Sequence, residues 1–292
     1  MNVLIIGGTR FFGIHTVNRL LENGHTVTIA TRGSHINPFE DKVYHLIMDK
    51  TDENSVRNVL QNQKYDVVID KVAYSSNDVR SLLKNICCGR YIQMSSCAVY
   101  RTEHLLIGEN EYDMRSHNLR WIDRTDDYAE GKRQAERAAL EFMDVKDCTF
   151  VRYPVVMGVN DYTRRLRFYI EHIMNGIPMF IDKPGFAASY INEHEAGEFL
   201  AYLVDNPLSG AVNGCSEGRI SQKAIIEYIE AKSNRSAIMS DKGDIAPYNG
   251  ISTDISYDCS KAESIGFSFS LLHSWIFNLL DSELGNYFNG GI

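Results

Sequence analysis

Tyr128 and Lys132 are the two residues whose types and spacing most directly suggest chemistry. Four residues apart on a helix, both side chains point the same way. A lysine ammonium beside a phenol lowers the cost of the phenolate, which a free phenol forms only at about pH 10. Together the pair can exchange a proton near neutral pH. The same spacing also arises by chance in a chain with 16 tyrosines, so its weight depends on what surrounds it.

Ser96 precedes the pair by 32 residues and follows the apolar stretch Tyr91–Met94. In a parallel sheet, the carboxyl end of such a strand faces the ligand cleft. Ser96 can therefore hydrogen-bond a substrate oxygen while Tyr128 exchanges its proton. In the alternative interpretation, the serine only ends a strand and Tyr128 is a surface aromatic. The order of the elements favours a catalytic group made of Ser96, Tyr128 and Lys132.

A glycine-rich turn follows the first apolar strand and precedes a helix. It reads Gly7-Gly8-Thr9-Arg10-Phe11-Phe12-Gly13. Glycines let the backbone approach a pyrophosphate, and the N-terminus of the following helix offers free N–H groups and a favourable dipole. Arg10 stands where a middle glycine is expected, and it either caps a phosphate or lies outside the turn. All seven residues are predicted to bind a dinucleotide.

The end of the second strand predicts which dinucleotide binds. An acidic residue there would bind the adenosine 2′-hydroxyl, but the run Ala30-Thr31-Arg32-Gly33 contains no carboxylate. Arg32 can pair with a 2′-phosphate, which favours NADP over NAD. The alternative is a surface arginine before a turn. Asp49, just past the third strand, either accepts a hydrogen bond from the adenine amino group or is an acid at a helix N-terminus.

The first half of the chain alternates apolar strands with helical stretches, the pattern of a parallel sheet covered on both faces. Strands are predicted at Val3–Ile6, Thr26–Ala30, Val43–Met48, Asp66–Asp70, Tyr91–Met94 and Thr149–Tyr153. Helices are predicted between them at Gly13–Glu22, Asn54–Gln61, Val79–Ile86 and Asp127–Phe142. This order predicts an α/β fold whose residues 1–155 form a Rossmann-type doubly wound domain, with contributions from later segments.

The second half, residues 156–292, is predicted to form a smaller α/β lobe that binds substrate. Its helices are expected at Arg164–Met174, Glu195–Leu203 and Gln222–Lys232. Residues 101–124 have no clear period and are expected to form a wall of the active site.

Composition limits the partners of this 292-residue chain. A formal net charge of −8 argues against a nucleic-acid partner, because that binding depends on clustered lysine and arginine. The opening run Val3–Ile6 is too short for a signal peptide or a membrane span, so we expect a cytoplasmic protein with no membrane partner. The six cysteines are expected to be reduced. His194 lacks the second histidine of a zinc-protease helix, and no metal is predicted.

These segments together resemble the extended short-chain dehydrogenase/reductase family, which includes NAD-dependent epimerases and dehydratases. Ser95-Ser96-Cys97-Ala98-Val99-Tyr100 is similar to the family's serine strand, and Tyr128–Lys132 to its Tyr/Lys helix. The resemblance makes Ser96 the catalytic serine and places Tyr153 beside the nicotinamide. It implies hydride transfer at a hydroxyl or carbonyl carbon of a small-molecule substrate, a sugar or a nucleotide sugar.

Departures from the family bear on the substrate. Where UDP-sugar epimerases that resemble this chain carry an asparagine and an arginine, it has Val155 and Ala188. A diphosphate-linked sugar would lose two contacts, for which Lys183 or Lys242 would have to compensate. The residues after Ser96 are not acidic, unlike those of the sugar dehydratases, which disfavours dehydration.

Several alternatives stay open at the level of sequence. A cofactor that stays bound gives net epimerisation, whereas one that exchanges gives reduction or oxidation. An NADP-binding sensor or scaffold without turnover is the rival function, because relatives with the same Gly-Gly-Thr-Arg turn include chloroplast RNA-binding proteins. A homodimer through the helices Val79–Ile86 and Asp127–Phe142, which relatives often pair, is also compatible with the sequence.

Overall fold

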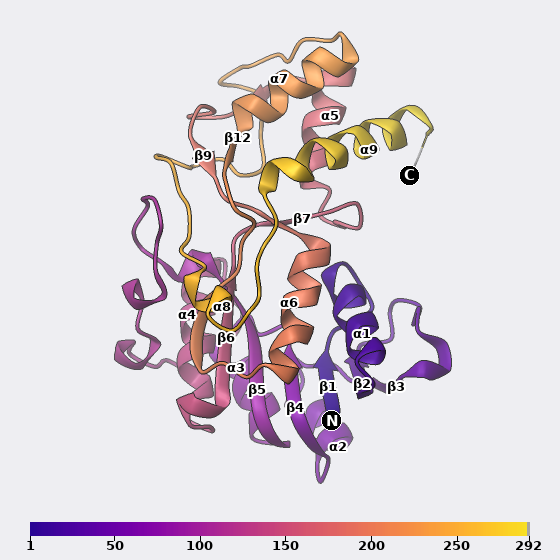
Figure 1. Cartoon of the computed structure of the whole chain (residues 1–292), viewed down its shortest axis with the longest axis vertical. Helices are drawn as coiled ribbons and strands as arrows, with labels where there is room; N and C mark the ends of the chain where they lie inside the picture. Colours follow the sequence, from indigo (N-terminus) through magenta and orange to yellow (C-terminus); the bar gives the residue numbers. More distant parts are fainter. Residues whose placement is uncertain (291–292) are drawn as a thin grey trace.

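A seven-stranded parallel sheet forms the core of the first domain, in the lower half of Figure 1; the structure is a computed structural model that describes residues 1–290. Its strands are β1 (Asn2–Ile6), β2 (Thr26–Thr31), β3 (Tyr44–Ile47), β4 (Lys64–Asp70), β5 (Cys87–Ser96), β6 (Cys148–Tyr153) and β11 (Gly210–Asn213). Their order is β11-β6-β5-β4-β1-β2-β3, and every neighbouring pair is parallel. The predicted Rossmann-type fold is confirmed. Sequence analysis found six of these strands and missed β11.

Helices cover both faces of the sheet because β1 is apolar on both sides. Val3 and Ile5 belong to the layer that includes α1 (Phe12–Glu22) and α6 (Glu193–Asp205). Leu4 and Ile6 belong to the opposite layer, with α2 (Glu53–Leu60), α3 (Ser76–Leu83) and α4 (Tyr128–Ala139). A strand that is apolar at every position is typical of parallel sheets buried on both faces.

Local capping fixes where the site-bearing segments begin. Asp127 accepts a hydrogen bond from the N–H of Glu130, so that α4 begins at Tyr128. Ser96 ends β5, and its Oγ accepts the N–H of Ala98 at 3.2 Å to start a short 3₁₀ turn. Such caps satisfy N–H groups that the first helical turn leaves free. Tyr128 therefore stands at the first position of α4, with Lys132 one turn farther along.

The second lobe packs α5 (Arg165–Asn175), α7 (Gln222–Ser233) and α9 (Ile276–Phe288) around an apolar cluster of its own, at the top of Figure 1. Three two-stranded pairs accompany them: β10 (Ile191–Asn192) with β7 (Val156–Met157), β12 (Ile220–Ser221) with β9 (Ala187–Ala188), and β13 (Asp244–Ile245) with β8 (Met179–Phe180). Neither α9 nor the short α8 (Ser260–Glu263) was predicted. Residues 193–213 return to the first domain, because α6 packs on α1 and β11 joins the main sheet.

Residues 101–124 do not form the active-site wall expected of them. The last part of this segment lies along α3 and α4: the Ser76 hydroxyl donates to the Arg120 carbonyl at 2.6 Å and accepts the Ile122 N–H at 2.7 Å. Its earlier part pairs with the chain near Tyr257. Of these residues, Arg124 reaches the cavity described below. Gly131–Glu136 of α4 are buried as a result, so a homodimer, which stays a prediction, would have to pair through the covering segment.

Some further features bear on the protein's environment. Within residues 1–290, no helix is both long and apolar enough to cross a lipid bilayer. The six cysteines are free thiols, of which Cys97, Cys148 and Cys215 are buried. No three His, Cys, Asp or Glu side chains of the described residues gather to hold a metal ion.

Candidate functional site

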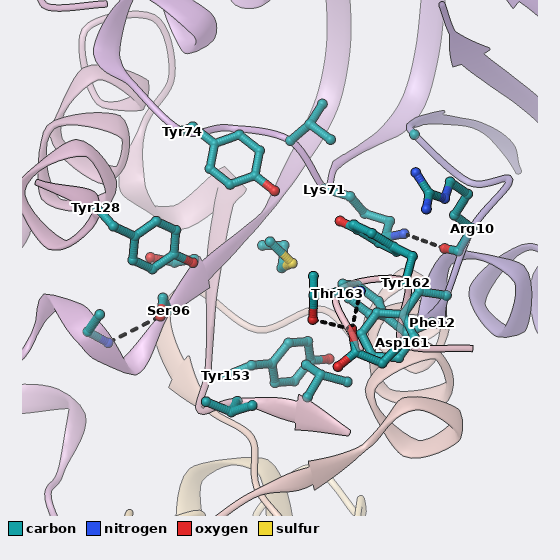
Figure 2. Close-up of a pocket in the computed structure, with 18 of the residues that line it drawn as sticks. Arg10, Phe12, Lys71, Tyr74, Ser96, Tyr128, Tyr153, Asp161, Tyr162 and Thr163 are labelled. Atoms are coloured by element: carbon teal, nitrogen blue, oxygen red, sulfur yellow. Dashed lines mark hydrogen bonds between the residues drawn. The ribbon is translucent and has the colours of Figure 1, made fainter. Parts of the chain in front are cut away.

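A cavity of about 770 Å³ lies between the carboxyl ends of the central strands and the second lobe. The glycine-rich turn and Arg10 line one end, and Ser96 and Tyr128 line the other (Figure 2). We call these the turn end and the tyrosine end. Two motifs far apart in the sequence thus meet in one cavity, whose volume is in the range of small-molecule sites.

The backbone of the turn end fits the diphosphate of a dinucleotide. Gly7 has a φ of +80°, and a Cβ on Gly13 would lie 3.0 Å from the Gly8 Cα atom, so both positions need glycine. Phe11 has a φ of 54°, which is strained for a bulky residue. The helix that follows, α1, has no side-chain cap and no acidic residue in its first turn. Its N–H groups and dipole therefore face the cavity with no anion of the chain's own.

Arg10 does not lie outside the site. Its guanidinium stacks on the Tyr162 ring, 3.8 Å from the ring centroid, and its Nη1 atom is 3.1 Å from His35 Nε2. Tyr162 belongs to the loop between β7 and α5, and His35 follows β2. Arg10 therefore bridges two loops at the rim of the turn end, where it can contact a phosphate. All residues from Gly7 to Phe12 line the cavity, and Gly13 packs closely against Gly8 of the turn.

Arg32 and Asp49, the residues predicted to read the adenosine, line the same end of the cavity. Asp49 accepts hydrogen bonds from Thr51, at 2.9 Å from the N–H and 2.7 Å from the hydroxyl. These bonds lower the pKa of Asp49, and the nearby Arg32 lowers it further. Asp49 thus closes a turn before α2, while a contact with adenine stays a prediction. Arg32 is exposed and has no carboxylate at ion-pair distance within residues 1–290.

The two serines that end β5 have different partners. Ser95 donates a hydrogen bond to Glu136 at 2.5 Å, and Glu136 in turn pairs with the buried Arg152 at 2.7 Å. Ser96 instead faces the Tyr128 phenol across the tyrosine end (Figure 2). Ser95 therefore belongs to a buried structural network, whereas Ser96 lines the tyrosine end, and its catalytic role stays a prediction.

Tyr128 and Lys132 sit as the helical spacing predicts. Burial raises the pKa of the Tyr128 phenol, an effect that the neighbouring Ser96 hydroxyl partly offsets. Lys132 is fully buried behind the tyrosine. Its Nζ donates to the carbonyl oxygens of Ala73 at 2.8 Å and Met94 at 3.0 Å, and lies 5.8 Å from the Tyr128 ring centroid. Burial lowers the pKa of Lys132 to about 7, although Asp70 acts in the opposite direction.

Tyr153 lines the floor of the cavity between the two ends (Figure 2). Its ring centroid is 6.3 Å from that of Phe12, and its hydroxyl donates to the Ala196 carbonyl at 2.7 Å. Because the hydroxyl is already used, the ring surface is the part of Tyr153 that can face a cofactor.

The second lobe supplies site residues that sequence analysis missed. Tyr190 and Tyr248 line the cavity, and their buried hydroxyls have no hydrogen-bond partner among the described residues. Buried polar groups are normally satisfied, so these hydroxyls are suited to a ligand. Arg165 also lines the cavity and pairs with Asp161 at 3.3 Å. No contiguous motif indicates these positions, because they come from separate parts of the chain: Tyr190 precedes β10, Tyr248 follows β13 and Arg165 begins α5.

Charge divides the cavity. Six lysine and arginine side chains line it: Arg10, Arg32, Lys50, Lys71, Arg124 and Arg165. Lys50, Arg124 and Arg165 form ion pairs with Asp70, Asp78 and Asp161 respectively. Within residues 1–290, Arg10, Arg32 and Lys71 have no carboxylate at ion-pair distance, and all three lie at the turn end. Val155 and Ala188 line the cavity, whereas Lys183 and Lys242, considered as compensating cations, are exposed and not among its lining residues.

Comparison with known sequences gives two matches. Residues 3–86 match the NAD dependent epimerase/dehydratase family. A curated relative, chloroplast stem-loop binding protein of 41 kDa b from Arabidopsis thaliana, is 25% identical over 203 residues, which are 65% of this chain and 51% of the relative. The match thus spans about half the length of that relative. Its name conflicts with the prediction that nucleic acid is not a partner, and assigns that protein to the chloroplast.

Solved structures share the fold over the whole chain. UDP-glucuronic acid 4-epimerase from Bacillus cereus, in complex with NAD, is 16% identical, with a TM-score of 0.73 over 99% of this chain and 98% of that one. UDP-glucose 4-epimerase from Thermotoga maritima is 14% identical, with a TM-score of 0.74 over 99% of each chain. At these identities the likeness establishes the fold alone.

Proposed function

We propose that this chain, whose residues 3–86 match the NAD dependent epimerase/dehydratase family, is an NADP-dependent oxidoreductase or epimerase acting on a sugar-like or nucleotide-sugar substrate. One observation carries the proposal: Ser96 and Tyr128 face each other in the same cavity that the glycine-rich turn enters. A dinucleotide whose diphosphate lies on the turn extends toward the tyrosine end, where a carbonyl oxygen can reach both hydroxyls.

Ser96 and Tyr128 perform the proton chemistry in this proposal. Ser96 donates a hydrogen bond to the substrate oxygen; Tyr128 gives that oxygen a proton from its hydroxyl in reduction and takes the proton as the phenolate in oxidation. Two backbone carbonyls hold Lys132 behind the ring, and the protonated form of Lys132 stabilises the Tyr128 phenolate. When bound, the nicotinamide supplies or accepts the hydride.

NADP is favoured over NAD by the charges of the turn end. Arg32 follows β2 at a strand end that itself carries no carboxylate, although Asp49 of the next strand end lies nearby without an ion pair, and Arg10 and His35 line the same cavity. A planar guanidinium recognises phosphate oxygens in a bidentate manner. These cationic side chains support NADP as the cofactor, whether it is exchanged after each turnover or stays bound.

The tyrosine end favours a substrate without a diphosphate. Its cations, Arg124 and Arg165, are already neutralised by carboxylates, and Val155 and Ala188 add no charge. The free hydroxyls of Tyr190 and Tyr248 suit the hydroxyl groups of a sugar-like ring. Within the proposed substrate classes, a neutral hydroxylated compound therefore fits better than a nucleotide sugar.

The proposal is tested by following the hydride. NADPH deuterated at the transferable position of nicotinamide C4 is incubated with the protein and a panel of keto sugars, sugar aldehydes and oxidised nucleotide sugars, and the products are analysed by mass spectrometry. We expect a gain of one deuterium in at least one neutral sugar product. Ser96→Ala and Tyr128→Phe should abolish it while leaving NADPH binding intact. Deuterium transfer that persists in Tyr128→Phe would contradict the proposal. So would a purified protein that carries no bound cofactor and transfers deuterium to none of the compounds.

A second candidate function follows from the Arabidopsis relative, whose name describes a stem-loop binding protein. In that case the chain binds a folded nucleic acid, with or without a dinucleotide. Fluorescence anisotropy with a labelled RNA stem-loop and a single strand of the same composition, at about 150 mM salt, tests it. Tight binding that prefers the stem-loop and survives Tyr128→Phe would favour this function, whereas equal and weak binding of both probes would exclude it.

A further inference from the structure

Lys71 is a buried lysine at the turn end that the proposed chemistry does not use. It is the first residue after β4, and 8% of its surface is exposed. Its Nζ lies 3.4 Å from the Arg10 carbonyl oxygen and 4.1 Å from the Phe12 ring centroid. A Cβ on Gly13 would collide with this ammonium. The amine is therefore packed directly against the glycine-rich turn, as Figure 2 shows.

The other buried lysines near the cavity have close polar partners, which Lys71 lacks. Lys50 forms an ion pair with the buried Asp70, and Lys132 donates to two carbonyls at 2.8 and 3.0 Å. Within residues 1–290, Lys71 has no carboxylate at ion-pair distance, and its carbonyl contact is long. Burying a cation without an anion is costly. Burial accordingly lowers the pKa of Lys71 to about 7.

A second feature at the same place also lacks an anion. Helix α1 spans 11 residues, and its N-terminus has no side-chain cap and no acidic residue in its first turn. The positive end of its dipole and the Lys71 amine face the same part of the cavity. The nearly buried amine and the uncapped helix end are thus two independent features that an anionic group would stabilise. A diphosphate is the anion that this cavity can bind.

Resting on the proposed function, we propose that Lys71 is the counter-charge of the dinucleotide diphosphate and takes up a proton from solvent when the dinucleotide binds. The neutral amine is the cheaper form in the free protein, and the ammonium is the form that pairs with phosphate oxygens. Binding therefore weakens as the pH rises above about 7, because the proton must be supplied. Arg10 and Arg32 are always charged and contribute no such pH dependence.

Other ionisable groups lie around Lys71 and must be separated from it. They are His15 on α1, Asp161 and Tyr162 on the loop before α5, and Asp70, which precedes Lys71 and pairs with Lys50. Burial, followed by the nearby His194, lowers the pKa of His15 below its usual 6.5. At pH 8 His15 is therefore neutral in the free protein, and His15→Gln controls for any proton it gains on binding.

Calorimetric titration with NADPH at pH 8, in two buffers of different ionisation enthalpy, tests the proposal. The difference in observed enthalpy between the buffers gives the number of protons taken up. We expect most of one proton for the wild type and for His15→Gln, and close to none for Lys71→Met and Lys71→Arg. Lys71→Met should weaken NADPH binding about tenfold or more, equivalent to about 1.4 kcal/mol, while Lys71→Arg, which keeps the charge, should weaken it less.

The outcomes separate this inference from the proposed function. If the wild type binds NADPH with the same affinity and the same proton uptake as Lys71→Met, the role of Lys71 is wrong while the cofactor site stands. If the wild type binds neither NADPH nor NADH, both proposals fall. Lys84→Met removes an exposed lysine that pairs with Glu53 and should change neither quantity. Thermal unfolding of each variant checks the fold, and Lys71→Met should melt above the wild type at pH 7 because it removes a buried, unpaired amine.

Discussion

The two ends of the cavity differ in how they treat charge. At the turn end, Arg10, Arg32 and Lys71 have no carboxylate at ion-pair distance within residues 1–290, whereas at the tyrosine end Arg124 and Arg165 are paired with aspartates. Unpaired cations around an uncapped helix end are suited to a polyanion. Paired cations and free phenol hydroxyls are suited to a neutral, hydroxylated molecule. The charged part of the ligand is therefore expected to be the cofactor, and substitutions at the two ends should have separable effects.

The largest expected effect is on the rate of the chemical step. Tyr128→Phe removes the proposed acid/base group at the tyrosine end and should lower hydride transfer by about 10²- to 10⁴-fold. The dissociation constant of NADPH should change less than twofold, because the turn end is untouched. Stopped-flow single-turnover kinetics and a binding titration measure the two quantities separately. A parallel loss of binding would mean that the two ends are not independent.

Arg32→Ala should reverse that pattern. Loss of a guanidinium at a 2′-phosphate should weaken NADPH binding about tenfold or more, and the affinity for NADH, which has no such phosphate, should stay within about twofold. Calorimetry with both nucleotides gives the ratio. Equal weakening for NADPH and NADH would assign Arg32 to the diphosphate or to the fold.

Stability should depend on pH through the buried lysines of both ends. The pKa of Lys71 and that of Lys132 are lowered to about 7 from 10.5, so between these values the folded state binds fewer protons than the unfolded state, and the free energy of unfolding rises with pH. At pH 7 the free energy of unfolding of Lys71→Met should be larger than that of the wild type. This difference should shrink by up to about 1.4 kcal/mol per pH unit toward pH 9. Urea unfolding at three pH values measures it. An advantage that stays constant would show that Lys71 does not titrate in this range.

The smallest expected effect concerns the free hydroxyls of the second lobe. Tyr190→Phe and Tyr248→Phe each remove one hydrogen bond to substrate, typically about 0.5–1.5 kcal/mol, and should raise KM by about two- to tenfold with little change in NADPH affinity. Because neither hydroxyl has a hydrogen-bond partner within residues 1–290, the folded protein should not be destabilised. A marked loss of stability in either variant would reveal a structural role for the hydroxyl.

The same contrast explains what the sequence could predict. The glycine-rich turn and the Tyr128/Lys132 pair are contiguous segments whose spacing encodes their geometry, and the strands between them are apolar enough to identify. Lys71, Tyr190, Tyr248 and Arg165 reach the cavity only through the packing of distant elements, which no local pattern records. Strand β11 was missed because Gly210–Asn213 is four residues long and carries no alternation. The prediction for residues 101–124 was wrong because a polar segment without helical or strand periodicity is as typical of a loop that covers helices as of a cavity wall.

Direct titration of the wild-type protein with NADPH and with NADH, after any cofactor retained on purification has been removed, is the measurement closest to the central claim. The charge distribution predicts saturable, one-to-one binding of NADPH, at least about tenfold tighter than that of NADH. A preference for NADH would refute the assignment of the turn end to a 2′-phosphate. The absence of binding by either nucleotide would contradict the account as a whole.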